Sequence, residues 1–354
     1  MSSEERAAPD KLPAAAIFAL LDGAPFGRLA TYAPPVGDHP GHCYVVPLQF
    51  LHREGRIYII TRPGRKLRNL QAASRGVCFQ LDLTEGAGWT SVCAWGDYHN
   101  VDQLRDRLSI LSASFTKYPD RTTHQAVSWL RSHTPRLGHL SNPAASQSFV
   151  IGCLALTSVS GRSWPGLLLS AGPRLVHPTS PVAAVLHGRG RPVRLDLDGC
   201  WEVLNARPLA RLGCYHPARE RTYCLPLWFA IEGRDLWFYH PGGSGQALIE
   251  ALREHPHGVC AQVDDLDCSP AADPGQPWRS VVAEGTVTVF ALDSGDELPP
   301  ERRHEILHTI RRRLHAFAIE SMFVPPDPDL APPAGFLLRL RMQVMGGQAT
   351  GSAV

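Results

Sequence analysis

The chain has 354 residues, of which 44% are hydrophobic and 19% charged, and its formal net charge is +2. These values are typical of a globular protein long enough for two domains, and they exclude a bulk electrostatic attraction to nucleic acid. The N-terminal segment has no apolar signal core, and no apolar run approaches membrane-spanning length. The nine cysteines form no CxxC pair, which favours a reducing compartment, so we expect a cytoplasmic protein. Arginine greatly outnumbers lysine, which indicates a GC-rich, bacterial genome.

Short β-rich runs, turns and three helical segments make up the first half of the chain. Apolar residues alternate between Gly, Pro and charged boundaries, and Leu104, Leu108 and Leu111 fall on one face of the longest helix. We expect residues 119–147 to be irregular. In chain order, the sequence predicts a helix at 12–21, strands at 27–32, 44–50 and 57–61, a helix opening at 65, strands at 77–81 and 89–101, a helix at 102–118 and a last strand at 148–161.

The segment at 57–82 predicts a strand, a basic turn, a short helix and a second strand. Pro63 and Gly64 end the first strand, and Arg65 and Lys66 open the helix. Two cationic side chains beside the free N–H groups of a helix start are suited to bind a phosphate group. A solvated basic turn is the alternative that this segment alone leaves open.

The pattern of the first half recurs in the second half. LDGAPFGRLAT matches LNARPLARLGC, VVPLQF matches CLPLWF, GVCFQLD matches GVCAQVD, and WTSVCAWG matches WRSVVAEG. These blocks place Arg28 on Arg211 and Pro47 on Pro226, and the helix at 102–118 matches residues 300–316. The spacing between blocks drifts, as expected when duplicated copies differ in loop length. The sequence therefore predicts a tandem duplication.

Each copy contains about six short strands, one long helix and intervening turns, which is typical of an antiparallel barrel rather than of alternating βαβ units. We expect a mainly β (α+β) protein with domains at 1–162 and 199–354, joined by a Pro- and Gly-rich linker at 163–198. Two similar barrels on one chain would pair about a pseudo-twofold axis as a fused homodimer. Clefts at such an interface are favoured ligand sites.

The ordered blocks GRLAT, VVPLQF, GRIYIITRPGRKLRNL, RGVCFQLD and WTSVCAWG resemble the FMN-binding split barrels related to pyridoxamine 5′-phosphate oxidase, in particular the branch that is similar to nitroimidazole reductases. The resemblance covers most of residues 15–162 and, more weakly, residues 199–348. It implies two tandem split barrels, each antiparallel with flanking helices, and FMN bound between them. The FMN phosphate would contact Thr61, Arg65 and Lys66, with Arg28 on a neighbouring strand.

The same resemblance implies a place for the flavin ring. The isoalloxazine would lie on the backbone of the VVPLQF strand near Val46, Pro47 and Leu48, and Trp89 and Ser91 would form part of the wall. This chain departs from the branch at Ile60, where a histidine is common, and this departure puts nitroimidazole-type chemistry in question.

The second copy departs further from the family pattern at the predicted phosphate end. Ala247 and Leu248 stand where the first copy has Arg65 and Lys66, and the preceding loop HPGGSG is longer. A Gly-rich loop can hold an anion through backbone N–H groups, but a plain turn is the simpler interpretation. We therefore expect one competent site, with the second copy as the opposing wall and scaffold.

Other motifs carry competing interpretations. His304, Glu305 and His308 match the zinc-peptidase pattern HExxH, but the arginine-rich flanks and the repeat match favour a chance occurrence and no metal. The RRRLH run favours a solvated helix face over a nucleic-acid contact. No GxGxxG motif supports a Rossmann site. Some split barrels bind haem, and the candidate axial ligands here are His42, His99, His187 and His240.

Three functional hypotheses follow from the sequence. The first is an FMN-dependent oxidoreductase that passes hydride or electrons between a reduced nicotinamide and an unknown small molecule, with no assigned catalytic residue. The second is a haem-binding split-barrel protein or enzyme, and the third is a non-catalytic duplicate that binds a cofactor or a partner. A deazaflavin would fit the same cleft. No nucleic-acid or membrane partner is expected, and the internal pseudo-dimer could be a monomer or a homodimer.

Overall fold

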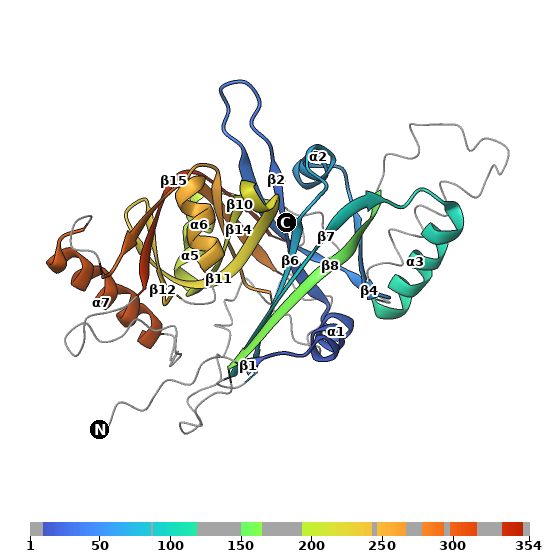
Figure 1. Cartoon of the computed structure of the whole chain (residues 1–354), viewed down its shortest axis with the longest axis horizontal. Coiled ribbons are helices and arrows are strands. Elements are labelled where there is room, and N and C mark those ends of the chain that lie inside the picture. The colour runs from blue at the N-terminus through green and yellow to red at the C-terminus, as the bar shows by residue number, and fades with distance from the viewer. Residues whose placement is uncertain are drawn as a thin grey trace.

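A computed structural model describes eight parts of the chain: residues 10–85, 88–118, 150–164, 193–242, 246–266, 278–293, 298–316 and 335–349. Two antiparallel sheets, one from each copy, lie side by side, and their longest helices lie at opposite outer ends of the molecule (Figure 1). Within the described ranges, no helix is both long and apolar enough to cross a membrane.

The first copy forms a curled sheet with three helices around it. Its sheet order is β3-β2-β6-β7-β8-β5-β4, and β1 pairs with β8. Only Phe50 separates β3 from β4, the two ends of this sheet. The elements are β1 (Asp10–Lys11), α1 (Ala14–Gly23), β2 (Phe26–Ala33), β3 (His42–Gln49), β4 (Leu51–Arg53), β5 (Arg56–Thr61), α2 (Arg65–Ala72), β6 (Val77–Glu85), β7 (Gly88–Asn100), α3 (Leu104–Lys117) and β8 (Val150–Trp164).

The second copy repeats this topology element by element. Its order is β12-β11-β10-β13-β14-β15-β9, and a further pairing of β12 with β15 closes the barrel. One strand, β11, stands where the first copy has β3 and β4. The elements are β9 (Val193–Leu195), α5 (Leu197–Ala206), β10 (Leu209–His216), a 3-10 turn (Pro217–Arg219), β11 (Arg221–Glu232), β12 (Asp235–His240), α6 (Gln246–Glu254), β13 (Val259–Asp264), β14 (Arg279–Ala291), α7 (Pro300–Ala316) and β15 (Phe336–Ala349).

Strand register confirms the duplication. Arg28 on β2 lies opposite Pro47 on β3 and Gln80 on β6. Arg211 on β10 lies in the same way opposite Pro226 on β11 and Gln262 on β13. A one-residue slip would turn each of these side chains to the other face of its sheet, so matching register shows that the copies agree residue by residue. The predicted mainly β, tandem split-barrel fold is confirmed.

The two copies meet through equivalent contacts. The backbone N–H of Thr222 donates to the carbonyl of Gly76 at 2.9 Å, and that of Cys43 donates to the carbonyl of Gly258 at 2.7 Å. Tyr32 and Tyr215 stack with ring centroids 3.9 Å apart and planes 2° apart. Because each contact joins equivalent positions from the two copies, the interface has the predicted pseudo-twofold arrangement.

Two glycines permit this close approach. Gly76 and Gly258 have φ angles of +59° and +66°, in the left-handed region that favours glycine. An added Cβ at Gly76 would fall on the carbonyl of Glu220, and one at Gly258 would fall on the carbonyl of Gly41. A side chain at either position would therefore push the two copies apart.

Buried apolar side chains extend from one barrel into the other. One cluster fills the second barrel and includes Val45, Cys78 and Trp95 from the first copy. A separate cluster, which includes Phe26, Leu29 and Phe79, fills the first barrel. The shared cluster removes apolar surface of both copies from water, which favours one joined body over two independent domains.

The outer helix of the first copy differs from the prediction. Leu104 and Leu108 are 47% and 42% exposed, whereas Ile110 and Leu111 are buried against Ile151. The predicted apolar face was therefore wrong at Leu104 and Leu108, because the helix packs on the sheet through its later turns. The irregular segment 119–147 lies outside the described residues, as does most of the predicted linker at 163–198, and the domain boundaries stay a prediction.

Candidate functional site

The candidate site begins where α2 starts. β5 ends at Thr61, three residues follow, and the helix opens at Arg65 without a side-chain cap from Gly64. The first backbone N–H groups of a helix have no intrahelical acceptor, and they carry the positive end of the helix dipole. The Thr61 hydroxyl lies just before this turn and donates to the carbonyl of Arg62 at 3.4 Å.

Lys66 is a cation without a counter-ion at this helix start. Burial lowers the pKa of Lys66, and no carboxylate pairs with it among the described residues. Removing an ammonium group from water is unfavourable unless an opposite charge compensates it. The position therefore favours a bound anion.

Arg65 has a counter-ion that comes from the other copy. Its Nη2 donates to Oε2 of Glu284 on β14 at 2.7 Å, and its Nη1 donates to Oε1 of the same carboxylate. The guanidinium also lies over the ring of Tyr44, 4.8 Å from the centroid. Burial acts against the charged form of Arg65, but the hydrogen bonds and charge of Glu284 outweigh it and raise the pKa of Arg65.

His42 is the next titratable group on β3. Burial, together with the positive charge of Arg65, lowers the pKa of His42, and Glu284 acts in the opposite direction. Side chains of His42, Tyr44, Val46 and Leu48 alternate with buried ones and share one half-buried face of β3. This face extends from the cationic corner toward the predicted ring position, and we call Thr61, Arg65, Lys66 and Glu284 the α2 corner.

Among the predicted ring contacts, Pro47 differs from its neighbours. Val46 and Leu48 lie on the half-buried face, whereas Pro47 is buried on the opposite face and lies opposite Arg28 in the ladder. A ring stacked on the backbone of β3 would therefore contact Val46 and Leu48 through side chains and Pro47 only through the main chain.

Arg28 does not belong to the α2 corner, which corrects the prediction. Its side chain is fully buried and forms part of a four-residue cluster with Asp82, Arg211 and Asp264, called here the interface charge cluster. Arg28 Nη2 and Nε donate to Oδ1 and Oδ2 of Asp264 at 2.8 Å and 3.0 Å, and Nη1 donates to Asp82 Oδ1 at 2.9 Å. An arginine held by two carboxylates cannot serve as a phosphate ligand without losing them.

The same geometry holds with the copies exchanged. Arg211 Nη2 and Nε donate to Oδ2 and Oδ1 of Asp82 at 2.6 Å and 3.1 Å, and Nη1 lies 3.3 Å from Asp264 Oδ1. Burial alone would raise the pKa of both carboxyl groups, but Arg211 and Arg28 outweigh it and hold the pKa of each below its usual value. Each arginine thus donates two hydrogen bonds to the aspartate of the opposite copy.

Trp89 and Ser91 lie away from the α2 corner. Tyr44, which contacts Arg65, pairs with Thr31 on β2, and the neighbouring Ala30 pairs with Cys78 on β6. The next residue of β6, Val77, pairs with Gly96, so the α2 corner lies near the Gly96 end of β7. Trp89 is seven residues from Gly96 along β7, which is about 23 Å at about 3.3 Å per residue. Ser91 lies opposite Asp82, beside the interface charge cluster. The structure does not bring these two predicted wall residues together with Arg65 and Lys66.

The second copy has a different chemistry at the matching corner. Leu248 is fully buried on α6, where the first copy has Lys66, and Ala247 replaces Arg65. His240 stands at the end of β12, where the first copy has Thr61, and its Nδ1 accepts from the Gly242 N–H at 3.0 Å. Burial lowers the pKa of His240 to about 4, so this imidazole is neutral at pH 7. We call Ala247, Leu248 and His240 the α6 corner, and none of these three carries a positive charge at pH 7. The guanidinium of Arg253, near the end of α6, lies over the ring of Phe336, 5.4 Å from its centroid.

The other predicted haem and zinc ligands among the described residues lie away from the α2 corner. His99 is exposed on β7, and His187 lies outside the described residues. On α7, Glu305 is exposed and pairs with Arg302 at 2.6 Å, while the rings of His304 and His308 lie 4.5 Å apart. Within the described ranges, no group of three or more His, Cys, Asp or Glu side chains is arranged to hold a metal ion.

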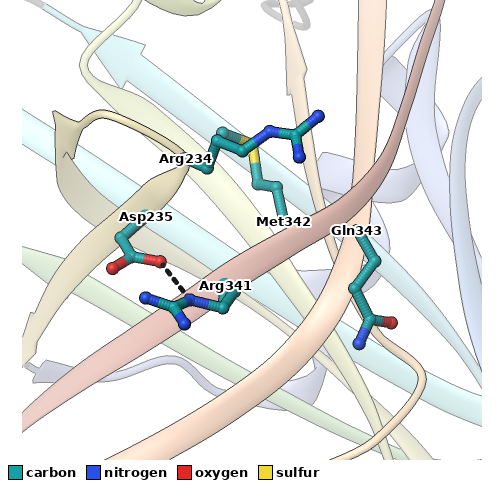
Figure 2. A pocket seen from close by; sticks show the side chains of 5 residues that line it. All are labelled: Arg234, Asp235, Arg341, Met342 and Gln343. Carbon is teal, nitrogen blue, oxygen red and sulfur yellow. Dashed lines mark hydrogen bonds and ion pairs between the residues drawn. The ribbon is translucent and has the colours of Figure 1, made fainter.

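Two surface hollows lie on the second copy and away from the α2 corner. One, of about 500 Å³, is lined by Arg234, Asp235, Arg341, Met342 and Gln343, and Figure 2 shows Arg341 turned toward Asp235, with Nε 3.3 Å from Oδ1. The other, of about 580 Å³, lies beside α5 and Arg279. Neither hollow includes a predicted site residue, and ion pairs occupy Arg341 in the first hollow and Arg279 in the second.

Several residues of this site were missed from the sequence alone. Asp82 and Asp264 had a signal, because QLD and QVD recur after Arg28 and Arg211 in the two copies. Glu284 stands in WRSVVAEG where the first copy has Trp95, so the repeat alignment marks it as a position where the copies differ. Tyr44 carried no signal beyond its place on the VVPLQF strand.

The paired barrels and their shared interface define a tandem split-barrel protein. The chain belongs to the pyridoxamine 5′-phosphate oxidase family, whose sequence profile matches residues 13–136 and again residues 196–319. The two matches together span more than half of the chain, which places both copies in the family and supports the duplication. No match was found among curated proteins.

Solved structures that resemble the chain each correspond to less than half of it. An FAD-binding protein from Mesorhizobium loti is 27% identical, with a TM-score of 0.32, over 45% of this chain and 100% of its own. A putative 5-nitroimidazole antibiotic resistance protein from Bacteroides thetaiotaomicron is 14% identical, with a TM-score of 0.32, over 45% and 87%. A haem storage protein from Vibrio cholerae is 11% identical, with a TM-score of 0.29, over 42% and 94%.

Proposed function

We propose that this chain is a flavin-binding oxidoreductase with one cofactor site, whose phosphate end is the α2 corner. The position of Lys66 carries the proposal, because this residue is a half-buried cation at the start of a helix and has no carboxylate partner among the described residues. Free N–H groups and a cation at a helix start are a common way to hold a phosphate. The family of the chain and the titles of similar structures support a flavin as the phosphate-bearing ligand.

FMN is the flavin that we propose for this site. Its single terminal phosphate would reach Lys66, Arg65 and the Thr61 hydroxyl, and its ring would follow the face of β3 that presents Val46 and Leu48. A bound flavin would supply the hydride or electron transfer itself, while the protein supplies binding, orientation and electrostatics. Lys66 would hold the phosphate, and the apolar face of β3 would shield the ring from water.

The second copy would serve as scaffold and opposing wall. Its α6 corner presents Leu248 rather than a cation, and Glu284 is the contact that it makes with the first copy's corner. A small-molecule substrate and a reduced nicotinamide would then meet the flavin at the interface of the barrels. We assign no protein acid or base to the reaction, because the flavin alone can accept and donate hydride.

The test is the absorption spectrum of the purified protein, taken before and after denaturation releases any ligand. We expect two broad flavin bands and about one released FMN per chain, and we expect Arg65→Ala/Lys66→Ala to lose the bands while circular dichroism stays native. A sharp Soret band would instead point to haem, and a deazaflavin spectrum would replace FMN. A colourless protein that does not take up added flavin would refute the proposal.

A further inference from the structure

Glu284 occupies the part of Arg65 that a phosphate would use. Both terminal nitrogens of the guanidinium donate to the two oxygens of this carboxylate. A bidentate arginine–phosphate contact needs the same forked pair of N–H groups. The carboxylate and a phosphate therefore cannot both bind the two terminal nitrogens of Arg65. Because Arg65 is paired with Glu284, Lys66 is the only cation of the α2 corner without a counter-ion.

The backbone aims Glu284 at the first copy. Glu284 lies on the half-buried face of β14, between the buried Ala283 and Gly285, and the register with β15 shifts beside it so that Gln343 of β15 is the extra residue. Gly285 cannot carry a side chain here, since an added Cβ would fall on the carbonyl of Arg341. The position of the carboxylate is thus built into the strand and does not depend on a flexible loop.

The equivalent position in the first copy carries a different side chain. There the register shift lies between Trp95 and Gly96, with Thr157 of β8 as the extra residue, and Trp95 Nε1 donates to the carbonyl of Thr222 in the second copy at 2.9 Å. Arg221 lies over the Trp95 ring, 5.3 Å from its centroid. Among the two equivalent positions, the acid therefore stands beside Arg65 and an aromatic residue stands beside the second copy's corner.

The Arg65–Glu284 pair is accessible enough to exchange partners. Its side chains are 33% and 18% exposed, in contrast to the sealed pairs of the interface charge cluster. Partly exposed ion pairs are weak compared with the contact between a guanidinium and a doubly charged phosphate. An incoming phosphate can therefore displace the carboxylate, at a cost in affinity.

We propose that Glu284 is an internal competitor for the ligand's phosphate, and that it sets how strongly the site prefers a phosphorylated flavin over an unphosphorylated one. This inference rests on the proposed flavin site. Removing the carboxylate frees the fork of Arg65 and adds one net positive charge to the α2 corner. FMN gains from both changes, whereas riboflavin, which has no phosphate, gains from neither.

The experiment measures dissociation constants of FMN and riboflavin by fluorescence titration for the wild-type chain, Glu284→Gln, Arg65→Ala and the double variant. Glu284→Gln should tighten FMN binding about fivefold to tenfold, with riboflavin unchanged. In the Arg65→Ala background the same change should tighten FMN binding only about twofold, because the charge change remains but the competed guanidinium is absent. Glu250→Gln, which removes a carboxylate paired with Arg219 on the surface, is the matched control and should change the dissociation constant of neither ligand.

The outcomes separate the inference from the function on which it rests. If FMN binds but Glu284→Gln leaves its affinity unchanged or weaker, the carboxylate positions Arg65 and does not compete, and the inference is overturned while the flavin site stands. A gain of the same size without Arg65, or one that riboflavin shares, overturns it as well. If neither flavin binds any of the four proteins, the proposed function fails and the inference fails with it.

Discussion

At the centre of the interface each charged residue has an equivalent in the other copy, whereas the α2 and α6 corners share none of their charges. Arg28 and Asp82 match Arg211 and Asp264 in identity, burial and partners. Lys66, by contrast, is matched by the fully buried Leu248. The duplicated copies thus agree where they hold each other and differ where a ligand would bind, which indicates that pairing constrains both copies and binding constrains only one.

The largest expected effect is at the interface charge cluster. Asp264→Ala leaves Arg28 buried without its two-point partner, so we expect the free energy of unfolding to fall by about 3–5 kcal/mol. Asp82→Ala should cost a similar amount, because it leaves Arg211 in the equivalent position. Urea unfolding measures both.

Asp235→Ala is the control for these variants, since it removes a carboxylate paired with the exposed Arg341 and should cost less than about 1 kcal/mol. A large difference between Asp82→Ala and Asp264→Ala would show that the centre of the interface is not symmetric in energy. That outcome would break the comparison between centre and corners.

The next effect comes from exchanging the corner residues. Leu248→Lys places an ammonium in a fully buried position with no described carboxylate partner, and should destabilise the protein by at least about 3 kcal/mol. Lys66→Leu removes a burial cost and should stabilise by up to about 1 kcal/mol while abolishing flavin binding. Thermal unfolding with and without FMN checks both. Equal responses of the two corners would contradict the asymmetry.

A third prediction concerns the pH dependence of stability at the second corner. Burial lowers the pKa of His240 from 6.5 to about 4, so the folded chain binds this proton less readily than the unfolded chain. The stability that the neutral His240 contributes is present above pH 6.5 and is lost as the pH falls toward 4. Between pH 7 and pH 5 the free energy of unfolding should fall by about 2 kcal/mol. His240→Asn keeps an acceptor for the Gly242 N–H but cannot titrate.

The test for His240 compares how steeply the free energy of unfolding changes with pH in the two proteins, because the substitution also changes packing and so shifts the absolute values. Unfolding free energies of the wild-type chain and His240→Asn should converge as the pH falls from 7 to 5. Thr61 stands at the equivalent position of the first copy, so Thr61→Asn should show no such convergence. Parallel curves for the wild-type chain and His240→Asn would mean that His240 is not held neutral by burial.

The smallest effect is expected on α7, away from both corners. Glu305 lies on the surface and pairs with Arg302, so Glu305→Gln should change the free energy of unfolding by less than about 0.5 kcal/mol. Added zinc should not raise the melting temperature of the wild-type chain. A zinc-dependent rise that disappears in His304→Ala would revive the HExxH interpretation.

Local patterns predicted the elements, the repeat and the helix start at Arg65, because strand propensity, Pro63–Gly64 and basic residues act over a few positions. The partners of Arg28 could not be predicted in this way. Asp264 reaches it from 236 residues away, and only the paired register of the two copies brings them together. The repeated Arg and Asp positions marked the residues but not their contact.

The role of Glu284 escaped prediction for a related reason. Its partner Arg65 lies 219 residues away in the chain, and only the pairing of the two copies brings the two side chains together. Leu104 and Leu108 show the limit of periodicity, since both have helical spacing but the helix meets the sheet through Ile110 and Leu111. Patterns along the chain therefore identified the elements, whereas contacts between elements determine which side chains lie at the candidate site.

The most direct test of the central claim is the stoichiometry of FMN binding, measured by isothermal titration of the ligand-free chain and of Arg65→Ala/Lys66→Ala. A single site at the α2 corner predicts about one FMN per wild-type chain and no measurable binding to the folded double variant. Two FMN per chain, or unchanged binding to the double variant, would contradict the account, because the α6 corner or another surface would then hold the cofactor.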